Sequence, residues 1–89
     1  MPYIKQDNRM DCDSALQELQ EMLPSDGTTA GKLTYIISNL IWKQFLDRPS
    51  YEAANKLLGV LEAVKLEFYR RHVAPYEDEA IRRNGDLNP

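Results

Sequence analysis

The chain has 89 residues, which is typical of one domain, and its composition is 43% hydrophobic and 28% charged. One cysteine and one histidine exclude an internal disulfide and a structural zinc site, which needs about four such ligands. The formal charge of −3 argues against a nucleic-acid binder. No apolar run approaches the ~18 residues of a membrane helix, and no apolar signal-peptide stretch opens the chain. We therefore expect a soluble cytoplasmic protein with no membrane contact.

The N-terminal third predicts a leader and one helix. Residues 1–10 are polar without a period, so we expect them to be extended. Apolar residues then recur every three or four positions, which predicts a helix over 12–23. Asp11 or Asp13 is the expected N-cap. Cys12 lies on the apolar face, and we expect it in the core as a small apolar side chain.

A second helix is predicted over residues 32–46, after a loop rich in turn residues. Its main apolar stripe runs from Leu33 to Ile41. When residues are placed at about 100° intervals around a helix, a second apolar stripe lies nearly opposite the first. A helix with two apolar faces is either central to its fold or shared with another subunit. The second stripe therefore predicts a homo-oligomer, most simply a two-fold dimer. The expected interface residues are Tyr35, Trp42 and Leu46.

A third helix is predicted from Tyr51 to about Val73, with Ser50 as its N-cap. Its apolar residues form a short heptad seam, which suits antiparallel packing against the second helix. Gly59 lies off this seam, where it would let another helix approach closely. The seam residues are Ala54, Leu57, Leu61, Val64 and Phe68.

Pro75 sets the expected helix boundary in the C-terminal part of the chain. The residue before Pro75 disfavours helical angles, so we expect the third helix to end at Ala74. Pro75 then opens a short fourth helix that ends before Gly85 and folds back onto the third. We expect residues 86–89 to be frayed. The predicted fold is thus a single all-α domain over 1–89, a small bundle of three main helices with an antiparallel hairpin and a short C-terminal helix.

The positive charge concentrates near the end of the third helix. Residues 32–76 carry seven bases and four acids, whereas both flanking parts are acidic. Arginines can clamp phosphate or carboxylate in bidentate fashion, and aromatic rings can stack on a base. By helical angle, Arg71 ranks above Arg70. The candidate ligand-binding residues are Lys65, Tyr69, Arg70, Arg71, His72, Tyr76, Arg82 and Arg83. The alternative is a solvated face whose arginines pair with nearby carboxylates.

Catalytic motifs are largely missing from the sequence. Cys12 lies between two acids, which oppose a reactive thiolate, so a pair with His72 is a poor nucleophile. The position three before His72 is Tyr69, so the Glu-x-x-His motif of di-metal bundles is absent. No glycine-rich loop ends in the Lys-Ser/Thr pair of a phosphate-binding loop. We therefore expect no enzyme, no cofactor and no metal.

Several segments carry a family resemblance. They are residues 1–5, 31–37, 51–52, 59–71, 74–78 and 84–86. Together they resemble a family of small uncharacterised proteins from bacteria and tailed phages. The resemblance implies no activity, but it implies a small intracellular protein in a phage or bacterial setting.

Two functional hypotheses follow. In the first, the chain is a non-catalytic binding protein, such as a phage counter-defence sponge that sequesters a small anionic nucleotide-derived signal. In the second, it is a helical protein–protein interaction module, a host-takeover or structural accessory protein, with no small-molecule ligand.

Overall fold

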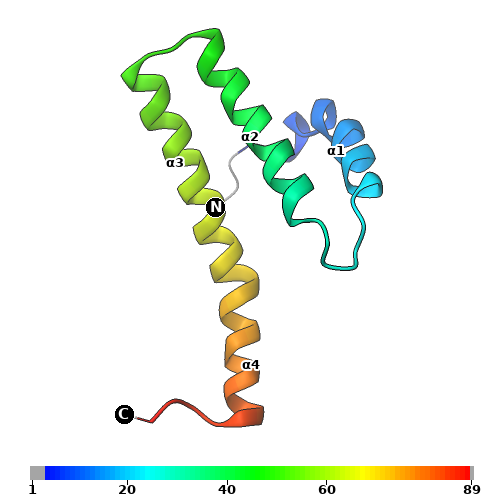
Figure 1. Cartoon of the computed structure of the whole chain (residues 1–89), viewed down its shortest axis with the longest axis vertical. Helices are drawn as coiled ribbons and strands as arrows, with labels where there is room; N and C mark the ends of the chain where they lie inside the picture. Colours follow the sequence, from blue (N-terminus) through cyan, green and yellow to red (C-terminus); the bar gives the residue numbers. More distant parts are fainter. Residues whose placement is uncertain (1–3, 89) are drawn as a thin grey trace. The chain divides into compact units, whose positions relative to one another are not determined.

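The computed structural model describes residues 4–88, and its elements are helical throughout (Figure 1). No strand is present within this range. The predicted all-α class, with three main helices and a short C-terminal helix, is confirmed. The elements in chain order are the 3₁₀ helix η1 (Gln6–Asn8), α1 (Met10–Met22), α2 (Ala30–Asp47), α3 (Tyr51–Phe68), the π-helix η2 (Tyr69–Val73) and α4 (Ala74–Asn84).

The chain divides into two compact units, residues 1–40 and 41–89, with the boundary inside α2. In the first unit, α1 begins at Met10, and its cap position Arg9 makes no side-chain capping bond. The prediction of an aspartate N-cap is therefore wrong, because η1 leads into α1 with Arg9 already in a helical conformation. Asp11 and Asp13 instead lie in the first turn, where negative charge favours the helix dipole.

Cys12 is exposed, so its predicted place in a core is wrong. Within the described part of this unit, the element packed against α1 is η1, and nothing covers the Cys12 face. The loop between α1 and α2 is ordered by Asp26, whose Oδ1 accepts bonds from the Thr28 hydroxyl at 2.6 Å and the Thr28 N–H at 3.0 Å. Both hydrogen bonds lower the pKa of Asp26, and the bond from the Thr28 hydroxyl has the larger effect.

In the second unit, the end of α2 turns into α3 through residues 48–50. The Ser50 Oγ accepts a bond from the Ala53 N–H at 2.9 Å, which confirms the predicted N-cap. This satisfies one of the amides that a helix start leaves without a partner. At the other end of this connection, just after α2, the Arg48 N–H donates to the Phe45 carbonyl at 3.2 Å. The result is a helical hairpin.

The third helix does not end at Ala74, and this prediction is wrong. Helical backbone continues through η2 into α4, and the Ala74 N–H donates to the Tyr69 carbonyl five residues earlier. Proline lacks an N–H, and its ring clashes with the carbonyl four residues back, here that of Arg71. The wider π turn accommodates Pro75 without a break.

Because the backbone does not reverse, α4 extends beyond α3 and does not fold back onto it, contrary to expectation (Figure 1). α4 ends where expected, at Gly85. This residue has a φ of 85°, and its N–H donates to the Ile81 carbonyl at 2.7 Å. A positive φ of this kind favours glycine, which carries no Cβ.

No residue between 4 and 88 is buried. The large apolar side chains are instead half-exposed or exposed, and Trp42 is 61% accessible. Gly59 also has open space around it, since an added Cβ would meet nothing within 4 Å. The close helix contact expected at Gly59 is therefore not seen among residues 4–88.

Candidate binding surfaces

The basic segment, defined as residues 65–83, carries all eight predicted ligand-binding residues. They lie on the last turn of α3, on η2 and on α4, and every one of them is exposed. The continuous helix thus places them along one helical segment, where the sequence had predicted two helices folded together. No second helix of this unit closes over them to make a cavity.

Glu67 is the centre of the most developed charge arrangement in the basic segment. Its carboxylate accepts hydrogen bonds from the Arg70 Nε at 3.0 Å and Nη2 at 3.3 Å, and it forms an ion pair with Arg71, whose Nε lies 2.9 Å from its Oε2. The hydrogen bond from Arg70, with the nearby charge of Arg71, lowers the pKa of Glu67. Arg70 and Arg71 contact the same carboxylate. The structure therefore gives no reason to rank Arg71 above Arg70 as a ligand-binding residue, as their helical angles had suggested.

The aromatic candidates are distributed around the same turns. A hydrogen bond to Glu77 raises the pKa of Tyr69, because it favours the neutral phenol. The His72 ring lies 6.0 Å from the Phe68 ring, at a tilt of 39°. Tyr76 is exposed on α4. Each ring therefore offers a face or an edge to solvent.

The remaining cations are partly paired. Lys65 Nζ lies 3.3 Å from Glu62, and Arg82 Nη2 lies 3.2 Å from Glu79, both as exposed pairs along the helix. Arg83 makes no ion pair among residues 4–88. Such exposed pairs are worth about 0–1 kcal/mol, so they can open for a ligand at small cost. These exposed ion pairs also agree with the alternative hypothesis, in which the basic segment is a solvated face whose arginines pair with nearby carboxylates.

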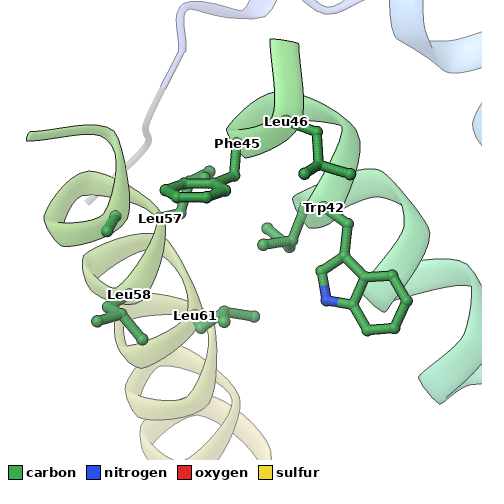
Figure 2. Close-up of a pocket in the computed structure, with 8 residues that line it drawn as sticks. Trp42, Phe45, Leu46, Leu57, Leu58 and Leu61 are labelled. Atoms are coloured by element: carbon green, nitrogen blue, oxygen red, sulfur yellow. The ribbon is translucent and has the colours of Figure 1, made fainter. Parts of the chain in front are cut away.

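A second surface lies between the two arms of the hairpin. The end of α2 and the first half of α3 border an apolar pocket of about 390 Å³ that is open to solvent, which we call the hairpin cleft (Figure 2). Figure 2 shows Phe45 pointing towards α3 and Leu61 towards α2. Its wall is almost entirely carbon. The lining residues are Ile41, Trp42, Phe45, Leu46, Ala54, Leu57, Leu58 and Leu61.

The three predicted interface residues fall in two places. Trp42 and Leu46 line the hairpin cleft. Tyr35 belongs to the first unit, where it lines a separate cavity with Met22 and Ile36. Sequence reasoning did not assign the α3 wall to this surface, although Leu57 and Leu61 stood on the heptad seam. Leu58 lies off that seam and carried no signal.

Two kinds of site are not seen among residues 4–88. No three side chains of histidine, cysteine, aspartate or glutamate gather closely enough to hold a metal ion. No described helix has both the length and the hydropathy to cross a membrane.

The chain belongs to a family defined as a domain of unknown function, DUF6899, whose model matches residues 1–87. The predicted membership of a family of uncharacterised proteins is thereby confirmed. No curated protein and no solved structure matches the chain.

Proposed function

We propose that this chain is a non-catalytic binding protein whose basic segment takes a small anionic, nucleotide-derived molecule. The observation that carries the proposal is the pair of guanidinium groups held by Glu67 within one turn of the π-helix. π-Helical turns are rare and are often found at functional sites.

Glu67 acts as a positioning group in this proposal. A guanidinium has five N–H donors in a fixed plane, and Glu67 engages only some of those on Arg70 and Arg71. The remaining donors can form the bidentate bonds that phosphate oxygens accept. Because the carboxylate already orders both side chains, less rotamer entropy is lost when the phosphate binds.

The rings supply the second half of the site. Tyr69 and His72 lie on the same π-helix as the two arginines, and Tyr76 follows on α4. A nucleobase can stack on such a ring with a gain of about 1–3 kcal/mol per base. A molecule with both phosphate and base therefore suits the segment better than inorganic phosphate does.

The biological role that we propose is sequestration. The resemblance to proteins of bacteria and tailed phages supports a setting in which a phage protein captures a defence signal in the host cytoplasm. The absence of a catalytic motif in the sequence supports capture without cleavage.

Titration calorimetry tests this proposal. The wild-type chain is titrated with cyclic dinucleotides, cyclic trinucleotides and ADP-ribose derivatives. The double substitution Arg70→Gln and Arg71→Gln should weaken binding at least about tenfold, because it removes the charge-assisted donors. Arg48→Gln is the matched control, since Arg48 is exposed on the hairpin connection outside the basic segment.

Recovery of the ligand separates the possible activities. Heat-denatured complex should release the nucleotide intact, and a processed product would instead indicate a hydrolase. Failure of the whole panel to bind would overturn the proposal.

A second candidate function is a helical interaction module without a small-molecule ligand. The hairpin cleft supports it, because an uncharged, carbon-walled cavity suits an apolar helix surface and not an anion. This candidate predicts no calorimetric response to nucleotides and no effect of the arginine substitutions.

A further inference from the structure

The π-helix η2 changes the rotational register between α3 and α4. An α-helix turns about 100° per residue, so residues eight apart lie about 80° from each other around its axis. In η2 the Ala74 N–H donates to the Tyr69 carbonyl five residues back, so this turn holds one residue more than an α turn. Residues eight apart across η2 therefore lie as residues seven apart do in an α-helix, about 20° from each other. Side chains that an uninterrupted α-helix would separate are brought onto one face.

Tyr69 and Glu77 are such a pair, and their side chains are hydrogen-bonded. Tyr69 begins η2, and Glu77 lies in the first turn of α4, so the bond spans the π turn. In an α register, Glu77 would be rotated about 80° away from Tyr69, and Tyr76 would lie about 20° from Tyr69 in its place. The bond between Tyr69 and Glu77 thus depends on the π register.

The same register aligns three rings. Phe68 and Tyr76 are also eight apart across η2, so they too lie about 20° from each other around the axis. His72 stands between them in the chain, and its ring is 6.0 Å from the ring of Phe68. Phe68 is 60% exposed and Tyr76 is 69% exposed. We call the surface formed by Phe68, His72 and Tyr76 the ring face.

We propose that Tyr69 and Glu77 are positioning residues, whose side chains bridge η2 and hold α4 in the register that forms the ring face. Pro75 favours the same register, because it cannot donate the backbone bond that an α turn needs at its position. Where it concerns the ligand, this inference rests on the proposed function: the base stacks on the ring face. Tyr69, whose hydroxyl is held by Glu77, orders that face and does not itself stack on the base.

The register can be measured without any ligand. A long-range HNCO experiment detects the coupling that passes through a hydrogen bond from an amide to its acceptor carbonyl, and in the wild-type chain the Ala74 amide should couple to Tyr69. Tyr69→Phe removes the hydroxyl and should lower this coupling by about half, because the turn then opens more often. Tyr51→Phe is the matched control, since Tyr51 is exposed at the start of α3. Circular dichroism checks that each variant keeps its helices.

Two substitutions at Glu77 separate the bridge from the charge. Glu77 lies in the first turn of α4, where a negative charge also favours the helix dipole. Glu77→Gln removes the charge but keeps an oxygen that can accept from the Tyr69 hydroxyl, so the Ala74 coupling should stay near its wild-type value. Glu77→Ala removes both and should lower the coupling as Tyr69→Phe does. The pKa of Tyr69, followed by carbon NMR, should fall in Glu77→Ala, because the bond to Glu77 raises it.

Calorimetry tests the part of the inference that concerns the ligand. Tyr69→Phe keeps a ring on which a base can stack, but it loses the bridge. It should weaken the binding of a nucleotide from the panel at least about threefold, because the ring face is then less ordered before binding. Glu77→Ala should have the same effect, and Glu77→Gln should not. Direct stacking of the base on Tyr69 would instead leave the affinity of Tyr69→Phe unchanged.

Three results would overturn the proposal. They are an Ala74 coupling that Tyr69→Phe leaves unchanged, equal losses in Glu77→Gln and Glu77→Ala, and a nucleotide affinity that Tyr69→Phe leaves unchanged. The first two results need no ligand. A panel that fails to bind therefore overturns only the proposed function, whereas an unchanged coupling with retained binding overturns only the bridge.

Discussion

The hairpin cleft and the basic segment share α3, but they meet opposite physical requirements. The cleft is lined by apolar side chains, and several of them, such as Trp42 and Leu58, are exposed. The basic segment is highly charged, yet Glu67 and the other carboxylates already pair with most of its cations. Apolar surface can be satisfied only by exclusion of water, whereas exposed charge is satisfied by water and by neighbours on the same helix. We therefore expect stability to depend on the cleft and pH sensitivity to depend on the basic segment.

Leu57→Ala should give the largest effect. If an apolar surface packs on Leu57, the substitution leaves a cavity and lowers the free energy of unfolding by about 2–5 kcal/mol. Urea denaturation at several protein concentrations measures the loss. Leu66→Ala is the control on the same helix. If the cleft stays open to water, both substitutions should cost only about 0.5 kcal/mol or less.

Ser50→Ala should come next. It removes the acceptor for the Ala53 N–H at the start of α3, with an expected loss of about 1 kcal/mol. Ser50→Asp retains a side-chain acceptor and should keep most of the stability. Equal melting temperatures for all three proteins would show that this cap contributes nothing to the hairpin.

Gly59→Ala should act in the opposite direction. The added Cβ meets nothing within 4 Å, and alanine favours a helix interior by about 1 kcal/mol over glycine. At about 100° per residue, Gly59 lies some 160° from Leu57, so a helix packed in the cleft would not touch it. Thermal unfolding should show a gain. A loss of stability would instead show that a close contact lies on the Gly59 face of α3, away from the cleft.

Acid titration should give the smallest effect, confined to the basic segment. The Arg70 hydrogen bond lowers the pKa of Glu67 in the folded chain. The stabilisation from this bond is therefore present above the ordinary glutamate pKa and is lost as pH falls through the lowered one. Carboxyl NMR measures the Glu67 pKa directly. Arg70→Gln should raise this pKa, and Arg48→Gln should leave it unchanged.

Much of the local structure could be predicted from the residues. Apolar spacing gave the three main helices, and Ser50 and Gly85 marked helix ends that the structure confirms. These signals are local, since a cap or a helical face depends on residues within one or two turns. The pairing of Arg70 and Arg71 with Glu67 is also a matter of short spacing, and it agrees with the solvated-face alternative.

The sequence by itself determined the all-α class, the approximate helix bounds and the basic segment, because helix formation and charge clustering are local properties. Only the tertiary structure decided that α3 continues through Pro75, that Trp42 and Leu46 share a cleft with Leu57 and Leu61, and that Tyr35 does not. These outcomes depend on how a π turn absorbs a proline and on which helix faces meet in space. The spacing of residues along one helix carries no information about what lies opposite that helix.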